Sequence, residues 1–186
     1  MYEGKNPTAM QSQQWITQAL LGMMREKSYA SITIRDLCRK ADLSRQTFYN
    51  LYASKEDVLH AYLRAEVKKV HEALVAGGSP RKPGIRDMVE AFTTVLLDNR
   101  ENLRLMIDQG LRGVVADEIA NAVSLFANSF ADRRKQDEQE LRYAAAFLSG
   151  GLAFTLLQWL REDTPPDGER LAQILETVLR GETYNL

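Results

Sequence analysis

The stretch from Thr33 to Lys55 limits the possible folds more strongly than any other part of this 186-residue chain. Thr33 is followed three residues later by Asp36, a spacing that is typical of a capped helix N-terminus. The apolar residues that follow recur at i, i+3, i+4 and i+7 and so share one helix face: Ile34, Leu37, Cys38 and Ala41. Asp42 tolerates turn conformations, and Ser44 can cap another helix by accepting from a backbone amide. The stretch predicts a short helix, a tight turn, a second short helix and the beginning of a third.

Two short helices joined by a short turn form a helix-turn-helix motif. Its second helix would carry side chains that can hydrogen-bond to nucleic acid: Arg45, Gln46, Thr47, Tyr49 and Asn50. Arginine pairs with guanine, glutamine and asparagine pair with adenine, and hydroxyls bind phosphate oxygens. Because such motif rules produce many false positives, the residues alone leave two interpretations equally open. One is a DNA-binding motif, and the other is a helical hairpin with one solvated face.

The rest of the chain shows helical periodicity and no alternating strand pattern. Glycine and proline cluster at residues 77–84, which predicts a linker and a domain boundary. We expect an all-α chain of about nine helices, with a three-helix head that contains the helix-turn-helix and a C-terminal helical bundle as the body. The expected domains are the head at 1–54, a connecting helix at 55–76 and the body at 77–186.

Charge is distributed unevenly along the chain, although the net charge is only -1. Residues 1–76 hold 11 Lys and Arg against 8 Asp and Glu, whereas the remaining residues hold 13 against 17. A basic head on an acidic body favours contact between the head and phosphate. The single cysteine, Cys38, excludes a disulfide within the chain, and its place on an apolar helix face is typical of a small buried hydrophobe.

The sequence lacks the common catalytic and metal-binding patterns. It has no nucleophile elbow, no glycine-rich nucleotide motif, no phosphate loop and no zinc-protease motif. His60 and His71 stand alone, so no histidine-containing metal-ligand spacing exists. We therefore expect no enzyme activity, no metal site and no cofactor.

The uncharged run from Tyr143 to Leu160 reaches the length at which a membrane span has to be considered. It contains polar residues and glycines, and its large apolar residues are clustered, so we expect a soluble helix that is buried on most sides. The first ten residues lack the apolar segment of a signal peptide. The expected location is the cytoplasm, with no membrane partner.

The helix-turn-helix stretch resembles the DNA-binding signature of the tetracycline-repressor (TetR) family of bacterial transcription regulators. The resemblance lies in the run Leu43-Ser44-Arg45-Gln46-Thr47-Phe48-Tyr49, then Tyr52, Ser54-Lys55 and Leu59. Asp42 departs from the family pattern, which usually has glycine in the turn. Leu51 stands where the family often has a polar or aromatic residue that touches phosphate. The glycine pair Gly150-Gly151, followed by apolar residues, is similar to the Firmicutes-type C-terminal subgroup.

The resemblance implies a dimeric transcription regulator that binds a palindromic operator, by default a repressor. The residues expected to contact bases are Arg35, Arg45, Gln46 and Asn50. The residues expected to contact phosphate are Thr33, Ser44, Thr47, Tyr49 and Lys55. Phe48 and Tyr52 are expected in the core. Two alternatives stay open: an activator controlled by a protein partner, and a dimeric interaction module without specific DNA contacts.

The resemblance also assigns the body to dimerisation and to control by an effector, either a small apolar ligand or a protein co-regulator. The expected dimer interface comprises Leu148, Gly151, Leu152, Thr155, Leu156, Trp159, Leu171, Ile174, Leu175 and Val178. The expected effector pocket comprises Met88, Phe92, Leu96, Met106, Phe126, Phe130, Tyr143 and Phe147, with Asp108 and Gln109 as further polar candidates. The alternative for both sets is a core that serves one chain alone.

Overall fold

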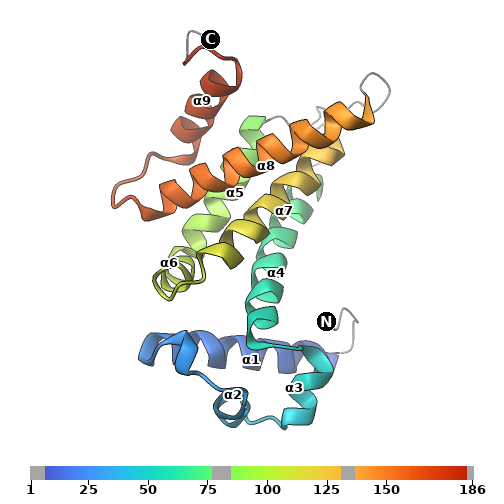
Figure 1. The fold of residues 1–186 in the computed structure, drawn as a ribbon, viewed down its shortest axis with the longest axis vertical. Helices are drawn as coiled ribbons and strands as arrows, with labels where there is room; N and C mark the ends of the chain where they lie inside the picture. The colour runs from blue at the N-terminus through green and yellow to red at the C-terminus, as the bar shows by residue number, and fades with distance from the viewer. Residues whose placement is uncertain (1–6, 77–84, 131–136, 184–186) are drawn as a thin grey trace. The chain divides into compact units, whose positions relative to one another are not determined.

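The computed structural model describes residues 7–76, 85–130 and 137–183. Over these residues the chain is all-α, with nine helices, one 3-10 turn and no strand, which confirms the predicted fold class. The elements are α1 (Pro7–Glu26), η1 (Tyr29–Ser31), α2 (Ile34–Lys40), α3 (Arg45–Leu51), α4 (Lys55–Ala76), α5 (Ile85–Asp98), α6 (Arg100–Asp108), α7 (Arg112–Phe130), α8 (Glu138–Arg161) and α9 (Gly168–Leu179) (Figure 1).

The chain divides into two compact units. The N-terminal unit comprises residues up to Ala65 together with Leu105–Val115, and the C-terminal unit comprises Glu66–Arg104 together with the residues from Ala116 onward. The end of α6 and the start of α7 therefore group with the helix-turn-helix. The sequence had placed these residues in the body, because nothing in their composition distinguishes them from the helices around them.

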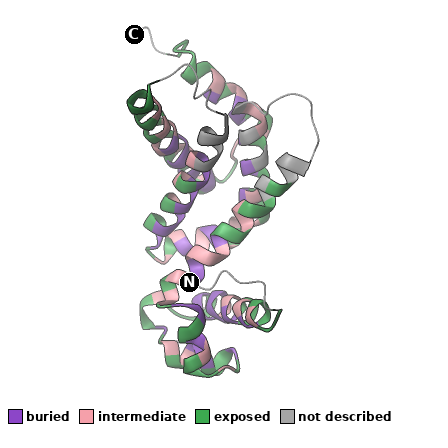
Figure 2. Ribbon diagram, turned by 90° about the vertical axis from the view of Figure 1, so that its right-hand side faces the viewer, coloured by how far each residue is buried: buried purple, intermediate pink, exposed green. Residues whose placement is uncertain are grey.

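The core of the N-terminal unit forms where α1, α2 and α3 pack together (Figure 2). The largest fully buried side chains of this unit are Ile16, Leu20, Met24, Leu37, Phe48, Val58, Leu59, Met106 and Val115. Cys38 is also buried, as predicted, and burial raises the pKa of its thiol. Apolar burial of this kind supplies the main driving force that holds short helices in place, because helices of seven residues are unstable alone.

Local capping explains where the two short helices begin. Thr33 Oγ1 accepts from the Asp36 amide at 3.1 Å, and Ser44 Oγ accepts from the Thr47 amide at 3.0 Å. Between the helices Asp42 adopts a φ of 53°, in the left-handed region. That conformation is the reason the family pattern favours glycine here, and aspartate is among the residues that tolerate it.

Substitutions at Asp42 test this turn. We expect Asp42→Val to lower the free energy of unfolding by about 1–2 kcal/mol, since a β-branched side chain is strained at positive φ. Asp42→Gly is expected to change it by no more than about 0.5 kcal/mol, because relief of strain offsets the extra freedom of the unfolded chain. Urea unfolding of the two variants measures both values. Equal losses for valine and glycine would show that side-chain contacts, not φ, determine the residue at position 42.

In the C-terminal unit α5 packs closely against α9. A Cβ added at Gly168, the first residue of α9, would lie 2.4 Å from Thr93 Oγ1 on α5. Thr93 is buried, and its hydroxyl donates to backbone carbonyls of α5. An ion pair at 3.2 Å between Arg86 and Glu176 joins the same two helices.

Because Thr93 has little room to move, we expect Gly168→Ala to lower the free energy of unfolding by about 1–3 kcal/mol. The control is Gly22→Ala within α1, where no atom lies within 4 Å of the added Cβ. That control should stabilise the protein by about 0.5–1 kcal/mol, as alanine does for glycine inside a helix. Denaturant unfolding compares the two, and a stabilising Gly168→Ala would contradict the close approach of α9 to α5.

Judged by length and composition alone, helix α8 is long and apolar enough to cross a membrane. Only 39% of its most apolar 18-residue segment is buried, so the expectation of a helix buried on most sides is wrong. One side faces the core through Leu152, Leu156 and Leu157, and the other side is exposed. The C-terminus of α8 is held by Arg100 and Arg104 of α6, which donate to the carbonyl oxygens of Glu162 and Arg161.

Candidate nucleic-acid interface

Helix α3 presents one polar face to solvent and one apolar face to the core. Phe48 and Leu51 are at most 5% exposed, and Tyr52, directly after the helix, is 2% exposed. Burial raises the pKa of the Tyr52 hydroxyl to about 12. The predicted core positions Phe48 and Tyr52 therefore anchor α3. Leu51 is buried too, so it offers no phosphate contact from the position where the family often has one.

The solvent-facing side of α3 carries the predicted base-contacting residues Arg45, Gln46 and Asn50, all of them exposed. Gln46 Nε2 donates to Asn50 Oδ1 at 2.9 Å, one helical turn away. The Arg45 guanidinium lies 6.0 Å from the centroid of the Tyr49 ring, within the range of a cation–π contact. These contacts align the polar side chains along one face, the arrangement that a helix needs in order to enter a major groove.

The predicted phosphate contacts fall into two groups. Tyr49 is 47% exposed on α3, and Ser44 and Thr47 share a 2.8 Å hydrogen bond between their hydroxyls at the start of that helix. Thr33, by contrast, donates its only hydroxyl proton to Asp36 Oδ2 at 2.8 Å. A hydroxyl that is committed to a carboxylate cannot donate to phosphate at the same time, so Thr33 is a helix cap in this structure.

Asp36 connects Thr33 to nearby positive charges. Its carboxylate lies 2.9 Å from Arg39 and 3.6 Å from Lys27. The hydrogen bond from Thr33 is the largest cause that lowers the pKa of Asp36, and the two cations lower it further. Arg35, the remaining predicted base contact, is exposed at the start of α2.

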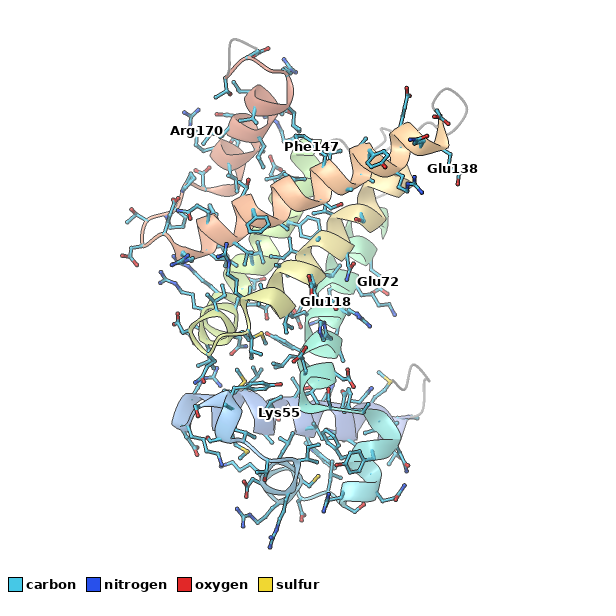
Figure 3. All side chains as sticks on the ribbon, in the orientation of Figure 1. Lys55, Glu72, Glu118, Glu138, Phe147 and Arg170 are labelled. Atoms are coloured by element: carbon cyan, nitrogen blue, oxygen red, sulfur yellow. The ribbon has the colours of Figure 1, made fainter. Side chains whose placement is uncertain are left out.

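Lys55, in the first turn of α4, is held inside the N-terminal unit (Figure 3). Its Nζ donates to the carbonyl oxygen of Tyr29 and, at 2.9 Å, to that of Ile32. The ammonium also lies 4.0 Å from the centroid of the Tyr29 ring, and desolvation lowers its pKa. Two of its three donors are therefore used within the protein. We reassign Lys55 from a phosphate contact to a side chain that fastens η1 to α4.

Lys55→Met tests this reassignment, because it removes the donors and keeps an unbranched side chain. We expect a loss of about 1–3 kcal/mol in the free energy of unfolding, since two carbonyl groups lose their partner. The slope of the logarithm of the DNA association constant against the logarithm of the salt concentration should not change. A phosphate contact would give the opposite pattern, a stable variant whose salt slope is smaller by about 1.

The described residues that were predicted to form an effector pocket differ in burial and in the unit to which they belong. Phe92 and Leu96 are buried in the C-terminal unit, while Met106 is buried and belongs to the N-terminal unit. Tyr143 and Phe147 are 63% and 75% exposed on α8, which corrects their assignment to an enclosed pocket within one chain. The side chains of Met88, Phe126 and Phe130 lie outside the described residues.

Several residues predicted for the dimer interface are core residues of the single chain: Leu152, Leu156, Trp159, Leu171 and Leu175. Each is at most 6% exposed and offers a second copy almost no surface, so their assignment is corrected. Ile174 and Val178 are each 39% exposed on α9, Gly151 is exposed on α8, and Leu148 and Thr155 are intermediate. The sequence could not separate these groups, because α8 is apolar on both sides.

The exposed side of α8 carries an aromatic and glycine surface instead, formed by Tyr143, Phe147, Gly150, Gly151 and Phe154. Figure 3 labels Phe147 on this helix. Apart from the nearby backbone of α8 itself, no atom of the described residues lies within 4 Å of a Cβ added at either glycine. Paired glycines inside a helix predict that another element packs closely against them. Among the described residues of the single chain, no element packs against Gly150 and Gly151 in this way.

Residues 16–62 match the sequence profile of the family described as bacterial regulatory proteins, tetR family. A Bacillus subtilis protein described as the uncharacterized HTH-type transcriptional regulator YxbF is 26% identical over 146 residues, or 76% of this chain. The chain spans 38% of the length of that relative.

Solved structures with low sequence identity share the fold. Lin0861 from Listeria innocua has a TM-score of 0.65 at 14% identity, over 97% of this chain and 96% of the other. A putative TetR-family transcriptional regulator from Syntrophomonas wolfei has a TM-score of 0.62 at 19% identity, over 94% and 96%. The multidrug binding protein EbrR, solved with imidazole, has a TM-score of 0.60 at 22% identity, over 93% and 90%.

Proposed function

We propose that this chain is a transcription regulator of the TetR family that binds a palindromic operator as a homodimer, with residues 16–62, which match the family profile, as its DNA-binding part. One observation carries the proposal: the polar face of α3, with Arg45, Gln46 and Asn50 exposed and aligned over a buried anchor. A helix of this kind can lie in the major groove, where each base pair presents a distinct pattern of donors and acceptors.

The side chains of α3 differ in what they can recognise. Arg45 has the donor geometry for the O6 and N7 atoms of guanine. Gln46 and Asn50 keep both donor and acceptor capacity after forming their mutual hydrogen bond, which suits adenine. Tyr49, Ser44 and Thr47 lie around the same helix and can position it against phosphate oxygens.

Homodimerisation is supported by the exposed sides of α8 and α9. Phe147 and Tyr143 on α8, and Ile174 and Val178 on α9, expose apolar side chains, while Gly150 and Gly151 leave room for close approach of another helix. Two helices from each of two chains form a four-helix interface, and a two-fold axis makes the same surface self-complementary. A two-fold dimer also matches the symmetry of a palindromic operator.

We further propose that the protein is a repressor and that an effector binds its C-terminal unit. Binding of the effector would release the protein from its operator. The effector can change operator affinity only by as much as it binds the two states differently. A protein of the same fold, EbrR, is described as multidrug binding, which supports a small apolar ligand over a protein co-regulator. The protein would act in the cytoplasm, where its DNA is.

The test is selection of bound duplexes from a random DNA pool with the purified protein, repeated at two salt concentrations. We expect enrichment of a palindromic sequence, with specific binding that survives at the higher salt better than binding to unselected duplexes. Binding that salt abolishes equally for all sequences would contradict specific recognition. The enriched duplex is the probe for the experiments below.

A further inference from the structure

The side chain of Gln109 reaches across the N-terminal unit to residues 80 or more positions earlier in the chain. Gln109 lies directly after α6, in the segment Leu105–Val115 that groups with the helix-turn-helix. Its Oε1 accepts from the Tyr29 amide at 2.8 Å, and its Nε2 donates to the Met24 carbonyl oxygen at 3.0 Å. A third contact, to the Lys27 carbonyl oxygen at 3.5 Å, is at the limit of a hydrogen bond.

Both main partners are backbone groups that secondary structure leaves unsatisfied. Met24 lies in the last turn of α1, where carbonyl groups have no partner inside the helix. Tyr29 begins η1, so its amide has no earlier carbonyl in that turn. One amide side chain therefore bridges the end of α1 and the beginning of the turn that leads to α2.

The turn after α6 holds Gln109 in a defined position. Gly110 adopts a φ of 84°, its amide donates to the Ile107 carbonyl oxygen at 3.0 Å, and the Leu111 amide donates to that of Met106 at 2.9 Å. This pair of bonds is a Schellman motif, which ends a helix in a fixed geometry. Leu111 is also buried, at 8% exposed.

Tyr29 is bound from a second side as well. Lys55 of α4 donates to its carbonyl oxygen and lies over its ring, while Gln109 accepts from its amide. The turn formed by Tyr29 and the next two residues leads within four positions to Thr33, the cap of α2. The direction in which α2 and α3 leave α1 thus depends on a turn held by two distant side chains.

We propose that Gln109 is a positioning residue for DNA recognition: through the Tyr29 turn it fixes the helix-turn-helix relative to α1 without touching DNA. The DNA part of this proposal rests on the proposed function, and the contact with Tyr29 does not. Loss of the amide leaves the basic surface of the head intact but lets α3 take more orientations. Specific contacts, which need one orientation, weaken, whereas binding to unselected DNA, which depends on charge, is retained.

Two substitutions at Gln109 separate its functions. Gln109→Met keeps the length and removes both hydrogen-bonding atoms, and Gln109→Glu keeps an acceptor for the Tyr29 amide but removes the donor to Met24. Amide hydrogen exchange at Tyr29 should accelerate about tenfold or more in the methionine variant and stay near the wild-type rate in the glutamate variant. The control is Gln18→Met, the same change at an exposed position of α1. An unchanged Tyr29 rate in Gln109→Met would overturn the contact.

DNA binding by the same variants tests the positioning. Affinity of Gln109→Met for the enriched duplex should fall about tenfold, while its affinity for an unselected duplex stays within about twofold of wild type. A variant that is merely destabilised would lose affinity for both duplexes together. Either that result or an unchanged affinity for the enriched duplex would overturn the positioning role, while the contact between Gln109 and Tyr29 would still stand. Wild-type protein that prefers no duplex would overturn the proposed function and this role with it.

Discussion

Arg45→Ala is expected to lower affinity for the enriched duplex by about 5- to 150-fold, the equivalent of roughly 1–3 kcal/mol. Arg45 is exposed on α3, where its guanidinium can form two hydrogen bonds with one guanine. Alanine removes both bonds and leaves the anchor of α3 in place, since Phe48 and Leu51 are unaffected. Fluorescence anisotropy with labelled duplex measures the loss.

The loss should be specific to sequence. Repeating the selection with Arg45→Ala should relax the preference at one position in each half-site, and the salt slope should stay the same because no phosphate contact is removed. Lys68→Ala is the control, since it removes one exposed positive charge from the C-terminal unit. A variant at position 45 that keeps the wild-type preference at every base would contradict the role of Arg45 in base recognition.

Gly151→Arg is expected to convert the proposed dimer to a monomer of 21.1 kDa and to abolish binding to the palindrome at concentrations where wild type is saturated. Gly151 is exposed, and no atom of the described residues beyond the local backbone of α8 lies within 4 Å of a Cβ added there, so we expect the single chain to accommodate the larger side chain. In a dimer formed by this surface the same side chain would enter a packed interface and bury a charge without a partner, which costs several kcal/mol.

Phe147→Glu is a second route to the same result, because Phe147 is 75% exposed and its removal opens no cavity in the chain. Gly113→Arg, at the start of α7, is the matched control: its Cβ position is equally open, and the variant should remain a dimer. Light scattering after size-exclusion chromatography gives the masses. Dimers in both the Gly151 and the Phe147 variants would show that the two chains associate through another surface.

Local chemistry made the helix-turn-helix predictable from the sequence. The caps at Thr33 and Ser44 depend on residues within one helical turn, so their spacing in the sequence is enough to predict them. The apolar side of each short helix also follows from spacing, and this predicted the burial of Phe48. The turn at Asp42 was predictable for the same reason, since it requires a residue that tolerates positive φ.

Contacts between distant residues were not predictable in the same way. The sequence assigned Lys55 to phosphate because a lysine at a helix N-terminus commonly binds anions, but its partners are carbonyl groups more than 20 residues earlier. Gln109 was a candidate for the effector pocket, and no periodic pattern relates it to Tyr29. On α8 the apolar residues surround the helix, so periodicity could not tell the buried side from the exposed one.

In the proposed complex, two copies of α3 contact two half-sites of one operator. Hydroxyl-radical footprinting on the enriched duplex, combined with the mass of the complex, tests it most directly. We expect two chains per dyad and two protected regions on one face of the duplex, related by a two-fold axis and separated by roughly 34–36 Å or a multiple of that distance. A single protected region bound by one chain, or uniform protection without a dyad, would contradict the claim.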